Sequence, residues 1–351
     1  MMPALPWRRQ MQAQADASSA GSHRTGSERV QDSQSWQGGN AGTSDFRFVP
    51  AFSSFSKMFG FFKKLASKAA QGPAGGNLGA EELARRLGVG EAELRGVAIE
   101  YHQFQLKKRT GGTRTISAPG EPLKAMQRRI LHRLLRRLSA HESATGFERG
   151  HSIVSNALPH VRKDVVIKLD LKDFFTSTPA ARIDAYFRKI GWNVDAAALL
   201  TRICTYDGAL PQGAPTSPRL SNLVNHLLDA RIAALAKSRD VSYSRYADDM
   251  TFSSAAASRR INDLITMVKI IVQDQGYSLH TAKKLRIARR ADRQIVTGLV
   301  VNEKVNLPRR TRRRLRAVEH HLKTGKPATL TPKQLEGWRA LRSMIVSQSS
   351  V

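Results

Sequence analysis

The stretch YSRYADDMTF, residues 243 to 252, places two adjacent aspartates, Asp248 and Asp249, inside a strand-like run of aromatic, β-branched and small residues. Like charges a few ångströms apart repel each other strongly away from bulk water. A second stretch, DVVIKLDLKDFF at 164 to 175, has the continuous apolar character of a buried strand and carries Asp170 near its end. A fold built on these two strands needs a positive partner for its acids.

A divalent cation is the natural partner. Hard cations such as Mg²⁺ take oxygen ligands and are usually held by one or two carboxylates together with substrate phosphates. Two such ions can activate a hydroxyl and stabilise a leaving pyrophosphate in an in-line displacement. This chemistry needs acids from more than one strand, so Asp170, Asp248 and Asp249 are the candidate ligands of two Mg²⁺ ions and the candidate catalytic residues. Taken alone, the dipeptide at 248 and 249 is also explained by a solvated turn.

Charge and composition indicate a polyanionic partner. The chain has 351 residues, of which 41% are hydrophobic, enough for a folded core of two or three subdomains. Its 57 Lys and Arg against 28 Asp and Glu give a formal net charge of +29. A compact state with this charge repels itself unless counterions or a polyanion neutralise it. Nucleic acid is therefore the expected partner, ahead of an anionic membrane surface.

Sequence features also predict a cytoplasmic location. No segment approaches the roughly 18 consecutive apolar residues that span a bilayer, and the N-terminal region lacks the apolar block of a secretory signal. The single cysteine, Cys204, excludes an intrachain disulfide, and no Cys/His cluster has the spacing of a structural zinc site. We therefore expect a soluble protein in a reducing compartment.

Residues 1–78 are expected to be a largely disordered tail. Residues 1–45 are rich in Gln, Ser, Gly, Ala and Asn and cannot bury enough apolar surface to offset the ordering entropy. An organelle transit peptide is the alternative, because the stretch is poor in acids and contains several arginines. An amphipathic helix is predicted within 52–70, packed on the main domain or a partner, with membrane-surface attachment less favoured. It is indicated by four phenylalanines at helical spacing: Phe52, Phe55, Phe59 and Phe62.

From residue 80 onward the sequence alternates between helical and strand patterns. Gly111 and Gly112 join two alternating strands into a hairpin. Because the order is mixed rather than strictly βαβ, we expect an α+β fold with a small antiparallel sheet and an all-helical C-terminal part. Helical patterns cover 81–97, 122–138, 179–190, 195–205, 217–237, 258–276 and the Arg-rich end from 307, and strand patterns cover 102–119, 164–175, 242–254, 285–289 and 294–301.

Three blocks of the sequence, in this order, resemble the reverse transcriptases. IKLDLKDFF at 167–175 looks like the first catalytic strand, LPQGAPTSPRLSNL at 210–223 like the substrate-positioning loop and helix, and YADD at 246–249 like the catalytic hairpin. Each block alone is weak evidence, whereas the three at these spacings are strong. The resemblance implies a right-hand polymerase fold with N-terminal helices and fingers at 79–165, a palm at 166–303 with part of the fingers at 178–215, and a basic helical thumb at 304–351.

The same resemblance implies roles at a nucleotide site. Phe175 stands where the family keeps an aromatic side chain that would collide with a 2′-hydroxyl, and Gln212 lies in the loop that approaches the incoming nucleotide. Lys107 and Arg114 flank the glycine hairpin and are expected to project onto the triphosphate, although a solvated basic hairpin is the simpler alternative. Lys283 resembles a lysine that orients or protonates the pyrophosphate. The predicted nucleotide-binding residues are Lys107, Arg114, Asp173, Phe174, Phe175, Gln212 and Lys283, with Lys284 as the alternative to Lys283.

Two further elements resemble the bacterial retron branch of the family. Asn156-Ala157 followed by His160 is similar to the Asn-Ala-x-x-His element of that branch, and VTG at 296–298 to its second marker. Taken singly, Asn156 and His160 are explained as residues that cap a helix or bond the backbone. The resemblance implies a cognate structured RNA that is primed on a guanosine 2′-hydroxyl and copied into branched multicopy single-stranded DNA. It also implies anti-phage defence with a separately encoded effector protein.

The C-terminal part carries six arginines within eight residues. A helix would spread them over more than one face, which suits phosphates on both sides of a bound RNA stem, because duplex RNA is recognised largely through its backbone and shape. A solvated helix is the alternative. The predicted RNA-binding residues are Asn156, His160, Arg309, Arg310, Arg312, Arg313, Arg314 and Arg316.

Three functions stay open on the sequence alone. The first is an active retron reverse transcriptase that uses Mg²⁺ and deoxynucleoside triphosphates. The second is another bacterial reverse transcriptase, of the group II intron, diversity-generating or abortive-infection type. The third is a non-catalytic RNA-binding protein on the same scaffold. Asp170, Asp248 and Asp249 argue against the third, because an acidic cluster repels RNA.

Overall fold

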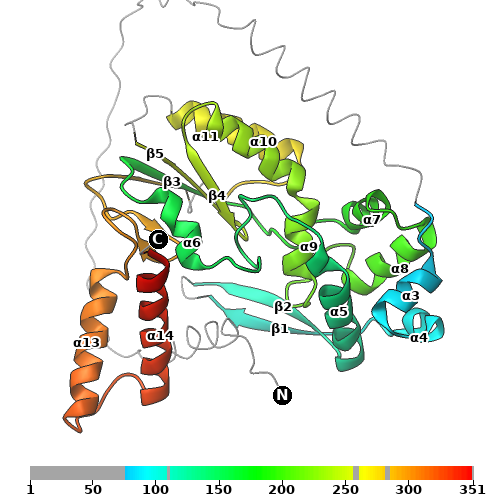
Figure 1. Ribbon diagram of the computed structural model, residues 1–351, viewed down its shortest axis with the longest axis horizontal. Coiled ribbons are helices and arrows are strands. Elements are labelled where there is room, and N and C mark those ends of the chain that lie inside the picture. Colours follow the sequence, from blue (N-terminus) through cyan, green and yellow to red (C-terminus); the bar gives the residue numbers. More distant parts are fainter. Residues whose placement is uncertain (1–75, 109–110, 256–260, 281–284, 350–351) are drawn as a thin grey trace, which may run out of the picture.

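The computed structural model describes residues 76–108, 111–255, 261–280 and 285–349 (Figure 1). The expected N-terminal tail up to residue 75, with its amphipathic helix, lies outside the described residues. Helices and strands follow one another in a mixed order, and the named strands pair in antiparallel fashion. The expected α+β fold with a small antiparallel sheet is confirmed.

A group of helices surrounds the first hydrophobic core. Each helix buries one apolar stripe, as amphipathic helices do, and fully buried side chains include Leu83, Leu87 and Phe187. The first of these helices ends at Gly88, whose φ of 65° is a left-handed conformation that glycine adopts without strain. The helices are α3 (Ala80–Leu87), α4 (Glu91–Gly96), α5 (Glu121–Arg133), α7 (Ala180–Lys189) and α8 (Val194–Cys204).

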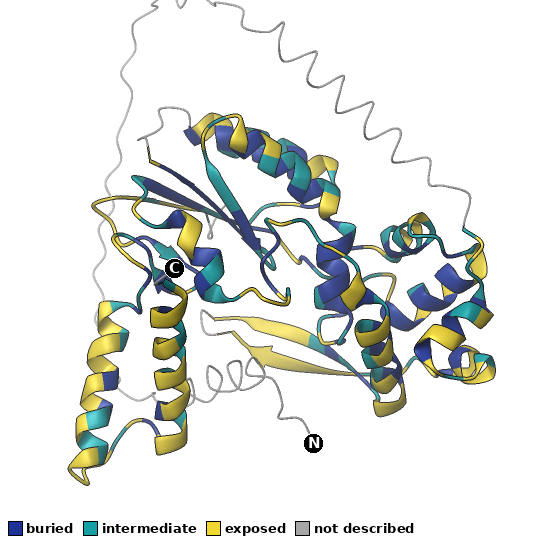
Figure 2. Cartoon of the chain, viewed as in Figure 1, coloured by how far each residue is buried: buried dark blue, intermediate teal, exposed yellow. Residues whose placement is uncertain are grey.

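The expected glycine hairpin projects from this helical group. Its strands β1 (Tyr101–Lys107) and β2 (Thr113–Pro119) pair antiparallel. Toward the turn the ribbon is exposed on both faces, as Figure 2 shows, and Phe104 and Leu106 keep 47% and 49% of their surface exposed. A ribbon that covers no core is available for contact with a ligand.

A four-stranded sheet forms the centre of the molecule. Its order is β4-β5-β3-β6, and helices α10 (His226–Lys237) and α11 (Ile261–Asp274) cover one face (Figure 1). Side chains alternate along a strand, so Ile167 of β3 packs under these helices while its neighbour Val166 joins a different core. The strands are β3 (Val165–Asp170), β4 (Ser242–Tyr246), β5 (Asp249–Ser254) and β6 (Arg286–Arg289).

The opposite face of the sheet meets a third hydrophobic core, which continues into the C-terminal helices. Val166 of β3 packs there with residues of α6, β7, β8, α13 and α14. Helices α13 and α14 lie side by side (Figure 1). No helix within the described ranges combines the length and the apolarity needed to cross a bilayer. The elements are α6 (Ile153–Ala157), the 3₁₀ turn η2 (Leu158–His160), β7 (Ile295–Val296), β8 (Leu299–Val300), α13 (Arg309–Lys323) and α14 (Pro332–Ser349).

Two helical patterns are interrupted in ways that the sequence pattern missed. The pattern at 217–237 forms two helices, α9 (Ser217–Val224) and α10, which are separated at Asn225. The Asn225 side chain donates to the Ser221 carbonyl at 2.8 Å and to the Tyr277 hydroxyl at 2.9 Å, so it links the break to a distant residue. The pattern at 122–138 ends its α-helix at Arg133 and continues as a 3₁₀ turn, η1 (Leu135–Arg137).

A fully buried ion pair joins the sheet to the helices that cover it. Arg245 on β4 and Asp229 on α10 have no exposed side-chain surface, and the guanidinium donates to the carboxylate at 2.8 and 2.6 Å. Burial alone would lower the pKa of Arg245, but the Asp229 carboxylate raises it overall, so the arginine stays charged. Removing one partner of such a pair leaves an uncompensated charge in the interior.

A buried histidine links two strands on the other face of the sheet. His160 is 0% exposed, and its Nδ1 and Nε2 lie 2.7 and 2.8 Å from the hydroxyls of Ser253 on β5 and Ser244 on β4. Burial, with a smaller contribution from Lys163, lowers the pKa of His160 to about 3. The imidazole is therefore neutral in the folded protein at ordinary pH.

We predict that Asp229→Ala lowers the free energy of unfolding by about 3–5 kcal/mol, because Arg245 would remain charged and unpaired in the core. Urea denaturation measures the loss. The matched control is Asp195→Ala, which removes an exposed ion pair with Arg95 and should leave the denaturation midpoint unchanged. Equal losses in the two variants would contradict the role of the buried pair.

We also predict that acid destabilises the protein through His160. The unfolded chain takes up this proton below its ordinary pKa of 6.5, whereas the folded chain does so only near 3, so stability is present above 6.5 and is lost as the pH falls toward 3. At pH 5 the loss from this group is about 2 kcal/mol relative to pH 8. Denaturation of His160→Gln at both pH values should show a pH dependence smaller by that amount, and an unchanged pH dependence would refute the prediction.

Candidate active site

Strand register brings the three predicted catalytic aspartates to one end of the sheet. Asp170, the last residue of β3, is the partner of Asp249, the first residue of β5. The backbone N–H of Leu171 donates to the Asp248 carbonyl at 3.0 Å, which ties the residue after β3 to the turn before β5. Residues opposite each other in an antiparallel pair lie about 4.5–5.5 Å apart at their Cα atoms. Asp170 and Asp248 are thus neighbours in the fold, although 78 positions separate them in the sequence.

The surroundings of these acids differ. Asp170 is 6% exposed, and its backbone carbonyl accepts from the N–H of His280 at 2.8 Å. Asp249 is more open, and the Nζ of Lys168 lies 3.6 Å from its carboxylate. Lys168 and Asp170 are two residues apart on β3 and so share one face of the sheet with Asp249. A lysine on this face partly offsets the negative charge of the acids.

The donor set is suited to a hard divalent cation. Asp170, Asp248 and Asp249 offer carboxylate oxygens, and a site of one or two carboxylates leaves room for waters and substrate phosphates, as Mg²⁺ sites usually do. Within the described part of the chain, no three His, Cys, Asp or Glu side chains converge as a ready-made metal cage. The three carboxylates by their donor type fit a hard cation that also takes ligands from substrate and water.

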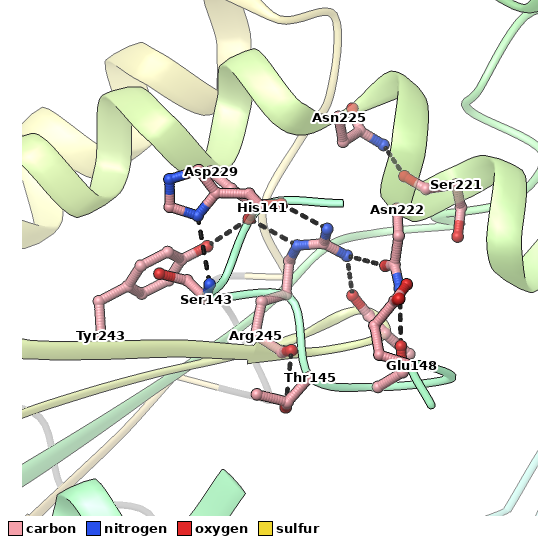
Figure 3. A network of polar contacts seen from close by, with 12 residues as sticks. His141, Ser143, Thr145, Glu148, Ser221, Asn222, Asn225, Asp229, Tyr243 and Arg245 are labelled. Carbon is pink, nitrogen blue, oxygen red and sulfur yellow. Dashed lines mark hydrogen bonds and ion pairs between the residues drawn. The ribbon is translucent and has the colours of Figure 1, made fainter. Parts of the chain in front are cut away.

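The turn that carries Asp248 is hydrogen-bonded to Arg245, whose pairing with Asp229 is shown in Figure 3. Ala247 has a φ of 59°, and its carbonyl accepts from Nη1 of Arg245 at 2.9 Å. The same nitrogen donates to Asn222 on α9 at 3.1 Å. A left-handed conformation at a non-glycine residue is uncommon and persists only where the surroundings enforce it. These contacts fix the backbone immediately before Asp248.

A second layer of polar contacts extends this support. Asn222 donates to Glu148 at 2.8 Å (Figure 3) and to the Gly146 carbonyl at 2.6 Å. Glu148 is also paired with Arg219. A Cβ on Gly146 would lie 2.6 Å from the backbone nitrogen of Ala247, so the segment can approach the turn only as glycine. Sequence reasoning missed this network. Its signals are an arginine two residues before the turn of the catalytic hairpin and the polar Asn222 and Asp229 on the two preceding helices.

The loop that contains Gln212 is docked on the glycine hairpin. The Gln212 carbonyl accepts from the N–H of Ser117 on β2 at 2.9 Å. Gly213 has a φ of 139°, and a Cβ there would lie 2.5 Å from the Ser117 carbonyl oxygen. Only glycine permits this approach, so the loop lies directly against β2.

The two predicted triphosphate residues lie on opposite faces of the hairpin. Lys107 pairs with Thr113, whereas Arg114 pairs with Leu106, and successive residues alternate between faces. Arg114 shares its face with Ile116, whose side chain lies close to Gly213. Both cations are exposed. The expectation that both project onto one triphosphate stays a prediction, and Arg114 is the one on the side of the Gln212 loop.

The residues after β3 separate into surface and core positions. Asp173 is exposed with a φ of 48°, and Phe175 is half-buried beside Phe147, with ring centroids 6.4 Å apart. Phe174 is 4% exposed, 5.7 Å from the Tyr277 ring and 5.4 Å from the Arg245 guanidinium. The expected contact of Phe174 with nucleotide is not compatible with this burial, because its ring is part of the core.

The remaining predicted site residues are placed as follows. Asn156 and His160 are 1% and 0% exposed, so the expected direct contact with RNA does not agree with their interior positions. The arginines of α13 are all exposed, and buried Leu315 and Val318 occupy its remaining side. Lys283 and Lys284 lie outside the described residues. The six exposed arginines of α13 are Arg309, Arg310, Arg312, Arg313, Arg314 and Arg316.

Comparison with known proteins identifies the family. A family model for reverse transcriptase, an RNA-dependent DNA polymerase, matches residues 106–299, which contain Asp170, Asp248 and Asp249. The chain is 39% identical to the retron Mx162 reverse transcriptase of Myxococcus xanthus, a match that covers 76% of this chain and 63% of that protein. It is 37% identical to the retron Ec86 reverse transcriptase of Escherichia coli, covering 67% and 73% of the two chains.

A third relative is also a retron reverse transcriptase. The chain is 37% identical to the retron Mx65 reverse transcriptase of Myxococcus xanthus, covering 76% of this chain and 68% of that protein. The chain thus spans just under two thirds of the Mx162 enzyme and somewhat more of the other two. From its three carboxylates at one sheet end, its family match and these relatives, the chain belongs to the reverse transcriptase family, the RNA-dependent DNA polymerases, on its retron branch.

Proposed function

We propose that this chain is an active retron reverse transcriptase that copies a cognate structured RNA into branched multicopy single-stranded DNA. The observation that carries the proposal is the register of β3 and β5, which sets Asp170 opposite Asp249 and next to the turn at Asp248. An RNA-binding protein without catalysis has no need for acids that repel its ligand. Retron enzymes act on an RNA template and deoxynucleoside triphosphates, and three relatives of this chain carry that name.

Members of this family generally use divalent metal ions, and we propose two Mg²⁺ ions here. Bound Mg²⁺ would activate the primer hydroxyl and stabilise the leaving pyrophosphate. Asp170 and Asp248 would hold it, with Asp249 in a supporting role beside Lys168. The tethered turn at Ala247 keeps the backbone of Asp248 in place while substrate enters. Such preorganised charge lowers the cost of rearrangement during the reaction.

The nucleotide is proposed to bind between the sheet end and the hairpin β1–β2. The contact between the Gln212 loop and β2 supports a site that both elements line. Arg114 extends from the face of the hairpin that adjoins this loop and supplies a cation for the triphosphate. The half-buried Phe175 is held by ring contacts and would exclude a 2′-hydroxyl. Lys107, Asp173 and a lysine at 283 or 284 remain predictions for this site.

The RNA is proposed to lie along α13. Its exposed arginines cover the side of the helix that is not packed against the core, and no ion pair joins them to a described acidic residue. Cations on several sides of one helix suit the phosphates of a folded RNA, which are read by charge and shape. The net charge of +29 supplies the same attraction over a longer range.

Further parts of the proposal concern the cell. We propose a cytoplasmic enzyme, which is supported by a single cysteine, Cys204, that is buried and unpaired by any disulfide. We also propose a role in anti-phage defence together with a separately encoded effector protein. The defence role and the effector partner are proposed from the similarity to the retron enzymes.

We predict that Asp248→Asn lowers the rate of DNA synthesis at least about a hundredfold, because a neutral amide cannot hold a divalent cation as a carboxylate does. Affinity for RNA should stay within about twofold of the wild-type value, because the RNA is proposed to bind the arginines of α13. Primer extension on an RNA template and filter binding measure the two quantities.

The matched control for this prediction is Asp240→Asn. Asp240 is exposed, precedes β4 and also has a left-handed φ, 52°, which asparagine tolerates. This variant should keep the wild-type rate. Undiminished synthesis by Asp248→Asn would remove Asp248 from the active site.

We predict that Phe175→Ala raises the efficiency of ribonucleotide incorporation relative to deoxynucleotide incorporation by about tenfold or more, because the ring no longer collides with the 2′-hydroxyl. Single-nucleotide extension with each nucleotide gives the ratio of kcat/KM values. Phe104→Ala, which removes an exposed ring on the hairpin, serves as the control and should leave the ratio unchanged. A ratio in Phe175→Ala equal to that of the wild type would assign the discrimination to another residue.

A further inference from the structure

His160 holds the two strands of the catalytic hairpin together. One imidazole lies within hydrogen-bonding distance of Ser244 on β4 and Ser253 on β5. Ser253 and Asp249 are four residues apart on β5 and so lie on the same face of the sheet. That face is opposite to the one held by Arg245 and Asp229. The hairpin is thus held from both sides, by an ion pair on one and by a neutral histidine on the other.

Asn156 is hydrogen-bonded to Thr145, whose segment of chain runs beside β4 of the same hairpin. Its Oδ1 accepts from the hydroxyl of Thr145 at 2.6 Å, and the Thr145 N–H donates to the Arg245 carbonyl at 2.9 Å. The path from Asn156 to the backbone of β4 therefore contains only one intermediate residue. Asn156 and His160 lie on consecutive elements, α6 and η2, so one short segment reaches β4 twice and β5 once.

The same segment is joined to the C-terminal part of the chain. The hydroxyl of Thr297, in the turn between β7 and β8, donates to the Ile153 carbonyl at 2.9 Å. Ser152 caps α6 and donates to Gln348 on α14 at 2.6 Å. Val154 of α6 is fully buried in the core that also contains Ile345 of α14. The two elements that resemble retron markers, at 156–160 and 296–298, are therefore joined through Ile153 of α6.

We propose that residues 153–160 and Thr297 form a hairpin clasp, which fixes the catalytic hairpin relative to the C-terminal helices, and that Asn156 and His160 are positioning residues rather than RNA contacts. The inference rests on the proposed function and names the role of two residues in it. The clasp sets the distance between the acids at 248 and 249 and the RNA held along α13. Small displacements of reacting groups have large effects on rate, up to about a hundredfold for 1 Å.

The electrostatics of the segment agree with this role. Phosphate binding requires exposed cations, whereas the two side chains are buried and His160 is uncharged, with a pKa of about 3. Ser244 and Ser253 are 3% and 1% exposed, so their hydroxyls face the protein interior. A variant of these serines can therefore disturb the clasp without touching RNA.

The test compares His160→Leu with the double variant Ser244→Ala/Ser253→Ala and with the combination of all three, in the full chain. The substrate is a homopolymeric RNA template with a complementary DNA primer. We expect kcat to fall about tenfold in the first two proteins and no further in the third, because all three lose the same contacts. The KM for nucleotide and the Kd for RNA should stay within about twofold.

Hydrogen exchange supplies a readout that does not depend on activity. Amides of β4 and β5 should exchange at least about tenfold faster in the variants, while those of β1 and β2 stay at the wild-type rate. His151→Leu is the matched control, because His151 is exposed next to α6. It should change neither kcat nor the exchange of the hairpin.

Two results would overturn the clasp. One is a tenfold weaker RNA Kd in His160→Leu with unchanged exchange of β4 and β5, which would make His160 an RNA contact. The other is a double serine variant with wild-type kcat and exchange. If His160→Leu fails to fold, the serine variant, which removes only two hydroxyl groups, decides the question. A wild-type protein without any DNA synthesis would refute the proposed function instead, and the exchange measurement would still decide whether the clasp exists.

Discussion

The buried pair of Arg245 and Asp229 is the interaction on which the rest of the structure depends. An arginine in the interior is tolerated only if a charge and several acceptors replace water. Here Nε and Nη2 donate to Asp229, and Nη1 donates to Asn222 and to the Ala247 carbonyl. One guanidinium therefore sets the relative positions of β4, α9 and α10 and of the turn before Asp248. No apolar side chain of similar size offers donors in these directions.

This anchoring explains how adjacent acids can stand at the end of a sheet. Repulsion between Asp248 and Asp249 would favour a different turn if the backbone were free to move. The backbone is held at Ala247 from one side of the sheet and through Ser244 and Ser253 from the other. Lys168 adds a positive charge 3.6 Å from Asp249. The acids can thus remain close together and available to a cation that arrives with the substrate.

Charged residues in the interior and on the surface have different roles. Interior charges are paired and hold the hairpin, as Arg219 and Glu148 do near the Gly146 segment. The arginines of α13 are exposed and have no described acidic partner. The buried histidine at 160 is neutral, so it adds no charge to the interior. The excess of positive charge is therefore directed to solvent, where a polyanion can reach it.

The sequence by itself determined the element types and the antiparallel character of the sheet and indicated the candidate acids, because apolar periodicity and block order depend on local chemistry. It also located the glycine hairpin and the basic C-terminal helix. Only the tertiary structure decided which of the indicated residues are buried and which are exposed. Phe174, Asn156 and His160 are interior residues, and Lys107 and Arg114 lie on opposite faces, because burial and strand register arise from contacts between distant segments. For the same reason the sequence did not show what Asp229 and Asn222 bind, because their partner, Arg245, reaches them only after the sheet and helices have packed.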